Sequence, residues 1–174
     1  MSEEITIDDR SRGDLRSNSG ILWRLVSDAV MGGISRGRLE PAVVEGRPCL
    51  RLTGAVRLEN DGGFLQASLD LAGDGLFDAS GCAGVELLVF GNGEIYNAHL
   101  RTADTTIVWQ SYRASFEAPP RWTTVRLPFS GFAPYRIGTP LDVSRLKRIG
   151  LVAIGREFTA DLCIGGLGLY RVTP

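Results

Sequence analysis

Residues 84–113 read GVELLVFGNGEIYNAHLRTADTTIVWQSYR, and this stretch decides the fold class. Apolar and other residues alternate over 84–90 and again over 95–101, and Gly91-Asn92-Gly93 separates the two runs. Alternation with a period of two is typical of a half-buried β-strand, and a Gly-Asn-Gly sequence is typical of a turn. The stretch therefore predicts strands over 84–90, 95–101 and 106–113.

Short apolar runs of the same kind recur along the rest of the chain. They are separated by turn sequences and lie at 21–26, 49–58, 63–71, 122–127, 148–154 and 158–172. The chain has 174 residues, 22 of them glycine and 8 proline, and one short helical turn is predicted over 140–147. Nine or so short strands predict an all-β sandwich of the jelly-roll type.

The domain organisation follows from length and polarity. Residues 1–19 are polar, and they are predicted to form a flexible N-terminal arm because they contain little that can be buried. The length of the remainder suits one domain, so residues 20–174 are predicted to form a single β-sandwich.

Composition argues against several classes of function. The net charge of −1, from 19 basic and 20 acidic residues, lacks the basic excess of nucleic-acid-binding proteins. The single histidine, His99, excludes sites built from several histidines. The sequence contains no nucleotide-binding loop and no paired-carboxylate motif, so we expect neither a cofactor nor an enzyme.

The same inspection gives an expected location. No run approaches the 18 apolar residues that read as a candidate membrane span, and the acidic start lacks the basic and apolar regions of a signal peptide. We therefore expect no membrane span and a cytoplasmic protein. The three cysteines, Cys49, Cys82 and Cys163, lie far apart and are expected to be reduced.

The strands predicted over 95–101 and 106–113 form a candidate hairpin. A two- or four-residue loop within Thr102–Thr105 places Arg101 opposite Thr106, and opposite residues share a face of the sheet. The predicted core face carries Tyr96, Ala98, Leu100, Ile107 and Trp109. The predicted outer face carries Asn97, His99, Arg101, Gln110 and Tyr112, together with Val108. If the strands 84–90 and 122–127 flank the hairpin, this face also includes Glu86, Trp122 and Arg126.

That outer face has chemistry suited to a ligand. Planar donors and acceptors beside aromatic rings suit a sugar or another polyol, and the same residue types are frequent at protein-binding hot spots. Two alternatives remain open at this point. An outer face of an antiparallel sheet can be simply solvated, and a three-residue loop would shift the register by one and separate the cluster.

A glycine-rich segment follows the first predicted strand of the sandwich. Residues 23–35 read WRLVSDAVMGGIS, which matches neither a P-loop nor a dinucleotide-binding fingerprint. Ser27 and Asp28 are expected to hydrogen-bond amides of this loop. Asp28, Asn60 and Asp61 could donate oxygen ligands to calcium, but without a defined binding loop no metal site is predicted.

This segment carries a resemblance to a known family. Its pattern W-x-x-V-S-D-x-V-M-G-G-x-S resembles that of the complex I intermediate-associated protein 30 family. Further matches follow in the same order over about 20–172. They are Gly62-Gly63-Phe64, Tyr96 with Leu100-Arg101, Trp122 to Val125 with Pro128-Phe129 and Phe132, Ile149-Gly150-Leu151, and Phe158 with Leu162, Ile164 and Tyr170.

The resemblance implies a galactose-binding-like jelly roll related to carbohydrate-binding modules. Eukaryotic members of the family act as assembly factors of the respiratory NADH:ubiquinone oxidoreductase, and this short sequence without a presequence resembles a stand-alone bacterial member. We expect a non-catalytic module that contacts a protein partner, such as a respiratory-complex subunit or assembly factor. Its contact residues are expected to be Asn97, His99, Arg101, Gln110, Tyr112 and Asp28. The alternative is binding of a small carbohydrate or polyol on the polar sheet face.

Overall fold

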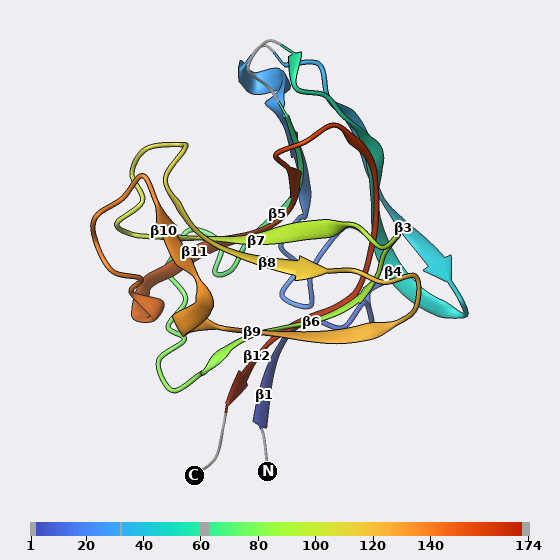
Figure 1. Cartoon of the computed structure of the whole chain (residues 1–174). Helices are drawn as coiled ribbons and strands as arrows, with labels where there is room; N and C mark the ends of the chain where they lie inside the picture. Colours follow the sequence, from blue (N-terminus) through green and yellow to red (C-terminus); the bar gives the residue numbers. More distant parts are fainter. Residues whose placement is uncertain (1–2, 32, 60–62, 172–174) are drawn as a thin grey trace.

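Two antiparallel six-stranded sheets face each other in the computed structural model, which describes residues 3–31, 33–59 and 63–171 (Figure 1). The first sheet has the order β3 (Arg36–Val44), β4 (Arg47–Val56), β12 (Phe158–Arg171), β6 (Gly84–Phe90) and β9 (Thr123–Pro128), and β1 (Glu3–Asp8) also pairs with β12. The second has the order β10 (Ala133–Tyr135), β8 (Ser111–Glu117), β7 (Ile95–Thr102), β11 (Leu146–Ile154), β5 (Phe64–Asp70) and β2 (Arg24–Ser27). This confirms the predicted all-β jelly-roll sandwich.

Within residues 3–31, 33–59 and 63–171, three short helical turns have bounds that can be given. These are the 3-10 helices η1 (Asp28–Met31), η3 (Phe129–Gly131) and η4 (Val143–Arg145). The last of them is the helical turn that the sequence predicted within 140–147. No helix within the described part of the chain is long and apolar enough to cross a membrane.

The core lies between the two sheets and is built from alternate residues of each strand. Val85, Leu87 and Val89 of β6 are fully buried, as are Ala98 and Leu100 of β7. Each such aliphatic side chain larger than alanine contributes about 1.5–3 kcal/mol by leaving water. The alternation that predicted these two strands therefore marks the residues that hold the sheets together.

Residues 3–19 differ from the flexible arm that the sequence predicted. Residues of β1 pair with β12, and Ile7 lies in the core at 8% exposure. The carboxylate of Asp8 accepts hydrogen bonds from the Trp23 indole at 2.8 Å and from Arg10 Nη1 at 2.9 Å. The composition argument failed here because the few apolar residues alternate as a strand, and because Asp8 accepts hydrogen bonds from the buried Arg10 and Trp23 side chains.

The predicted hairpin has a different register. Strand β8 begins at Ser111, so residues 103–110 form a loop, and His99 lies opposite Arg113 rather than Arg101 opposite Thr106. The loop has its own support. Arg101 donates hydrogen bonds to the carbonyls of Thr105 and Ile107 at 3.0 and 3.3 Å. The sequence prediction assumed a loop of two or four residues, and these bonds stabilise the longer loop that the structure has.

In the observed register, three side chains lie on the side of the sheet opposite to the one that was predicted, or in the loop. Tyr112 lies opposite Leu100 and is fully buried in the core, where its hydroxyl donates to the Thr139 carbonyl. Ile107 and Trp109, which were predicted in the core, are 40% and 53% exposed in the loop. The prediction for these three side chains was therefore wrong.

The strands expected to flank the hairpin lie in the other sheet. β6 pairs with β9 and β12, so Glu86 and Arg126 form an ion pair at 2.8 Å on the first sheet. Trp122 lies there too, beneath the Arg47 guanidinium. The connections from β6 to β7 and from β8 to β9 cross between the sheets, so these neighbours along the chain do not share a sheet.

The glycine-rich segment is organised around one buried carboxylate. Asp28 accepts hydrogen bonds from the amide of Ser35 at 2.9 Å and of Phe64 at 3.1 Å, and also from Gly63 N and the Ser35 hydroxyl. Gly33 is needed beside it, because a Cβ there would meet Asp28 Cγ at 2.4 Å. The expectation that Ser27 and Asp28 bind local amides is confirmed, since Ser27 Oγ accepts from Ala29 N at 3.2 Å.

Because Tyr112 is buried and Trp109 is exposed, truncating these two side chains should lower the free energy of unfolding by very different amounts. Tyr112→Ala should lower the free energy of unfolding by about 3–5 kcal/mol, because it leaves a core cavity. Trp109→Ala should change it by about 0.5 kcal/mol or less, as at other exposed positions. Urea denaturation of both variants measures this difference, and a larger loss for Trp109→Ala would contradict the register.

Asp28→Ala should destabilise the fold by on the order of 3 kcal/mol, because several buried donors lose a charged acceptor.

The same carboxylate makes the stability depend on pH. Burial raises the pKa of Asp28, but the hydrogen bonds from Ser35, Gly63 and Phe64 outweigh burial and lower the pKa below 3.8. Asp28 therefore stabilises the fold above its unfolded pKa, and this contribution disappears as the pH falls through the folded pKa. Denaturation curves between about pH 6 and pH 3 should show a smaller acid-induced loss in Asp28→Ala than in the wild type. Asp74→Ala, at an exposed turn, is the control and should behave as the wild type.

Candidate functional site: a groove on the second sheet

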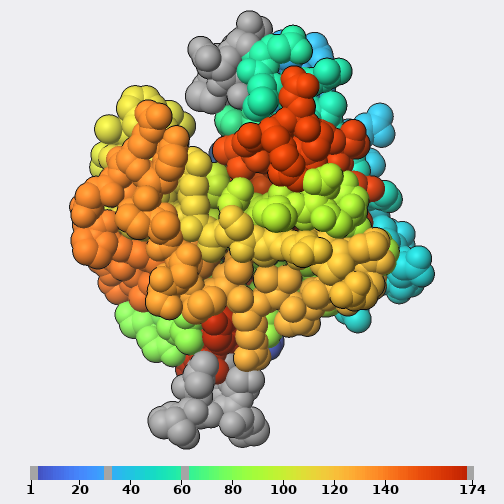
Figure 2. All heavy atoms as spheres, in the orientation of Figure 1, coloured from blue at the N-terminus to red at the C-terminus, as the bar shows by residue number. Residues whose placement is uncertain are grey.

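A groove of about 730 Å³ lies on the outward face of the second sheet. Strands β2, β5, β7, β8 and β11 contribute to it, and the loop 103–110 and residues 135–136 form one side. In Figure 2 the hollow lies between the yellow and orange segments on the left and the red end of β11. We call this site the sheet groove.

The floor of the sheet groove is a row of three residues on adjacent strands. Gly150 of β11 lies opposite His99 of β7 on one side and Ser68 of β5 on the other. A Cβ at Gly150 would meet Gln66 Oε1 at 1.8 Å, so a side chain there would displace Gln66. Glycine thus keeps the middle of the groove open.

His99 is a neutral, partly unsatisfied group in this floor. Its side chain is buried, with the residue 9% exposed, and its Nε2 has no hydrogen-bond partner among the described residues. Burial, followed by the nearby charge of Arg113, lowers the pKa of His99 to about 3. The imidazole is therefore neutral at pH 7, and a ligand could satisfy Nε2 without meeting a further positive charge.

Arginines line the middle row and one end of the sheet groove: Arg113 lies opposite His99 and Arg24 opposite Ser68, and the pair of Arg101 and Arg148 lies beyond that row. Their lining members are Arg24, Arg101, Arg113, Arg136 and Arg148. Asp70 pairs with Arg148 at 2.6 Å and with Arg24 at 3.5 Å. The Arg113 guanidinium stacks 3.6 Å from the centre of the Tyr135 ring, with Arg136 5.3 Å from the same ring. Stacking holds these guanidinium groups without neutralising them.

Asp70 compensates Arg148 and Arg24, whereas Arg101, Arg113 and Arg136 have no carboxylate partner among the described residues. Burial and then Arg148 lower the pKa of Arg101, and burial lowers the pKa of Arg113 with Arg136 adding to the effect. No aspartate or glutamate belongs to the described lining of the groove. The end is therefore strongly positive and partly desolvated.

The other end of the sheet groove is apolar. Val152 lies beside Gln66 and Ile154 beside Phe64, while Val26 lies on the far side of Gln66. The exposed side chains of Val108 and Trp109, at 71% and 53%, lie on the rim beside Arg101 and not at this end, because Arg101 Nη1 donates to the Val108 carbonyl. The groove therefore runs from aliphatic side chains to arginines along the direction of β11.

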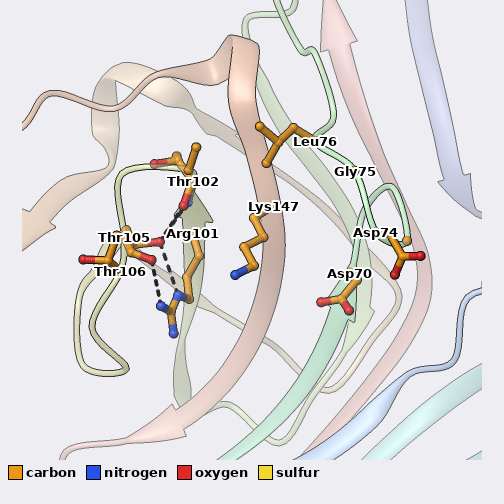
Figure 3. A pocket seen from close by; sticks show the side chains of 11 residues that line it. Asp70, Asp74, Gly75, Leu76, Arg101, Thr102, Thr105, Thr106 and Lys147 are labelled. Atoms are coloured by element: carbon orange, nitrogen blue, oxygen red, sulfur yellow. Dashed lines mark hydrogen bonds between the residues drawn. The ribbon is translucent and has the colours of Figure 1, made fainter.

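A smaller pocket of about 490 Å³ adjoins the positive end (Figure 3). Arg101 lines both hollows, and Lys147, Asp70 and Asp74 also reach the pocket (Figure 3). Thr105 Oγ1 accepts a hydrogen bond from Arg101 Nε at 3.3 Å and donates one to the Thr102 carbonyl at 2.8 Å. Arg101 thus joins the two hollows while holding the loop between them.

The structure brings some of the predicted site residues together and separates others. His99, Arg101 and Gln110 line the sheet groove. Gln110 does so from the loop, where it accepts from the amides of Thr106 and Ile107 at 3.0 and 3.1 Å. Asn97 accepts a hydrogen bond from Ser115 Oγ at 2.9 Å and is outside the groove lining.

Two predicted site residues have structural positions instead. Tyr112 lies in the core, and Asp28 is fully buried with both carboxylate oxygens bound to the chain's own donors. Asn60 and Asp61, weighed as calcium ligands, lie outside the described residues. Among the described residues no group of three or more acidic, histidine or cysteine side chains could hold a metal ion.

The sequence missed most of the arginine cluster. Arg148, Gly150 and Val152 alternate along a correctly predicted strand, as do Gln66 and Ser68. This alternation was a usable signal for one outward face. The information that it lacked was strand order, because β11 rather than β6 or β9 lies beside β7.

Comparisons with known proteins agree with this architecture. Among solved structures, the family 11 carbohydrate-binding module of the cellulosomal cellulase Lic26A-Cel5E of Clostridium thermocellum is similar, with a TM-score of 0.75, 14% identity and coverage of 96% of this chain and 94% of that one. A structure of the Clostridium thermocellum family 11 module in complex with a β-1,3-1,4-mixed-linked tetrasaccharide gives a TM-score of 0.71 at 15% identity, covering 97% and 94%.

The family 30 carbohydrate-binding module of the cellulosomal cellulase Cel9D-Cel44B of Clostridium thermocellum gives a TM-score of 0.68 at 14% identity, covering 100% and 99%. At these identities the likeness shows the fold. Comparison with curated proteins gives no match. The family model described as complex I intermediate-associated protein 30 (CIA30) matches residues 13–164. Since this match extends over most of the 174 residues and includes the segment organised by Asp28, the chain belongs to the CIA30 family.

Proposed function

We propose that this protein is a non-catalytic binding module that engages a protein partner through the sheet groove. The partner that the family's description suggests is a subunit or assembly factor of respiratory complex I. One observation carries the proposal: Val108 and Trp109 are exposed on the rim of a groove lined by arginines. Tryptophan, tyrosine and arginine are the residues enriched at protein-binding hot spots.

The chemistry of the groove favours binding over catalysis. General acid–base catalysis needs a titratable group near the working pH and a second positioned group. His99 titrates far below neutrality, with its pKa lowered to about 3 by burial and by Arg113. The described lining offers no carboxylate to orient it.

Carbohydrate binding is the second candidate, and the fold likeness favours it. Carbohydrate-binding modules share this architecture, and one of them is known with a tetrasaccharide bound. In this chain Trp109 could stack on the C–H face of a sugar, while Gln66 and His99 could bind hydroxyl groups. The two candidates use the same groove and differ in the ligand.

A tagged protein expressed at its native level and recovered with mass spectrometry should distinguish them. The wild type should recover respiratory-complex subunits or assembly factors, and Val108→Ala combined with Trp109→Ala should recover at least about tenfold less, since hot-spot truncations remove about 2 kcal/mol or more each. Val43→Ala is the matched control, because Val43 is 72% exposed on β3 of the other sheet.

Recovery that is equal in the double variant and the control would contradict the proposed contact surface. The alternative is measured separately by calorimetric titration with a mixed-linked glucan tetrasaccharide. Saturable binding of the sugar that Trp109→Ala abolishes, without recovery of any respiratory protein, would replace the protein-partner function with carbohydrate binding.

A further inference from the structure

We propose that the sheet groove binds an extended acidic segment of the partner protein, with aliphatic residues at one end of the segment and carboxylates at the other. This inference rests on the proposed protein-binding function and adds the chemistry of the partner. Three features of the groove support it: its positive charge, the change from aliphatic residues to arginines along β11, and the unpaired Nε2 atom of His99.

The charge of the groove calls for an anion. Asp70 is shared between Arg148 and Arg24, while Arg101, Arg113 and Arg136 have no carboxylate within ion-pair distance in the described structure. Arg101 is instead bound to carbonyls, and Arg113 to the Ser111 hydroxyl at 2.9 Å. Partly buried cations that repel one another are stabilised by charge-assisted hydrogen bonds from an anionic ligand, and guanidinium groups match carboxylates in geometry.

The direction of the groove sets the polarity of the ligand. Along β11 and β5 the opposed pairs change from Ile154 and Phe64, through Gly150 and Ser68, to Arg148 and Asp70. From Arg148 to Ile154 there are six residue steps along the strand, which is about 20 Å. About six residues of an extended peptide cover that distance. A segment lying along the groove would thus place its aliphatic side chains over one end and its carboxylates over the other.

A buried histidine nitrogen that lacks a hydrogen-bond partner lies between the two ends of the groove. His99 Nε2 is buried without a partner among the described residues, and its ring belongs to the groove floor beside Gly150. A buried polar atom of this kind is stabilised when a ligand supplies its hydrogen bond. The backbone of an extended peptide offers both donors and acceptors at each residue, so it can satisfy either tautomer of the imidazole.

The apolar end distinguishes a peptide from an acidic sugar. Among the described lining residues of that end, Gln66 between Val26 and Val152 is the one hydrogen-bonding side chain, so most hydroxyl groups of a sugar would be desolvated there without partners. Aliphatic side chains of a peptide gain about 25 cal/mol per Å² of buried apolar surface at the same place. The observations therefore favour an acidic polypeptide over an acidic oligosaccharide.

The test uses fluorescence polarisation with short synthetic peptides and the intact chain. The probe is a labelled peptide of Leu-Val-Leu-Glu-Asp-Glu, and its matched control carries Leu-Val-Leu-Gln-Asn-Gln. The acidic peptide should bind at least about tenfold more tightly than the amide peptide, which is the effect of losing one or two charge-assisted contacts. Raising the salt concentration should weaken the acidic peptide selectively.

Variants locate the binding to the groove. Arg113→Gln combined with Arg136→Gln should weaken the acidic peptide at least about tenfold and leave the amide peptide nearly unchanged. Arg38→Gln, at an exposed position of β3 in the other sheet, should bind as the wild type. Thermal unfolding of each variant checks that the fold is intact, and Arg136→Gln alone, at an exposed residue, replaces the pair if it unfolds early.

Equal affinity for the two peptides, or equal loss in Arg38→Gln, would overturn the inference. Saturable binding of oligogalacturonate with no binding of the acidic peptide would also overturn it, in favour of an acidic sugar. The outcome is separable from that of the proposed function. If respiratory proteins are recovered through Val108 and Trp109 but their recovery is unaffected by Arg113→Gln with Arg136→Gln, protein binding stands and the acidic segment is wrong.

Discussion

The carboxylate of Asp28 is the contact on which the organisation of this end of the sandwich depends. It accepts hydrogen bonds from Ser35, at the far side of the loop that follows β2, and from Gly63 and Phe64, at the start of β5. One charged group thus joins two connections that the chain separates by about thirty residues. Because Phe64 begins the apolar end of the sheet groove, the position of that wall depends on a residue that lies outside the groove lining. The Ser-Asp and glycine pattern by which the sequence resembles its family is therefore, at Asp28 and Gly33, a requirement of the fold.

Arg101 has the corresponding role at the opposite end of the groove. Its guanidinium donates to carbonyls of Thr105, Ile107 and Val108, which fixes the loop that carries Trp109 to the rim. These carbonyls are dipoles and leave the net charge in place, so the group that shapes the loop also contributes to the positive field of the groove. Structure and electrostatics cannot be separated at this residue. Arg113 differs, because it stacks on Tyr135 and contributes charge without supporting a loop.

How far the sequence predicts this molecule depends on which information is local. Alternation in residues 84–90 and 95–101 predicted β6 and β7 well, because the alternation of buried and exposed residues can be recognised within the sequence of each strand alone. Register is not local: Tyr112 moved from the outer face to the core because eight residues, rather than four, form the loop before β8. Strand order is not local either, so Glu86 and Arg126 were placed on the wrong sheet while Arg148 was missed. The prediction placed His99 and Arg101 on the outward face because β7 itself was predicted correctly.

The shared architecture and the local chemistry of the groove lead to different inferences. The sandwich that this chain shares with carbohydrate-binding modules offers an outward sheet face, and a face of that kind does not specify a ligand. Specificity comes from what the face leaves unsatisfied. Here the features without a partner among the described residues are the Arg101, Arg113 and Arg136 guanidinium groups, which lack carboxylates, and the neutral imidazole nitrogen of His99. A neutral sugar would satisfy the imidazole but would leave the cations uncompensated in a partly dry groove, whereas an acidic peptide satisfies both. The neutrality of His99 is part of this argument, because the surrounding arginines already supply the charge and the imidazole adds only a hydrogen bond.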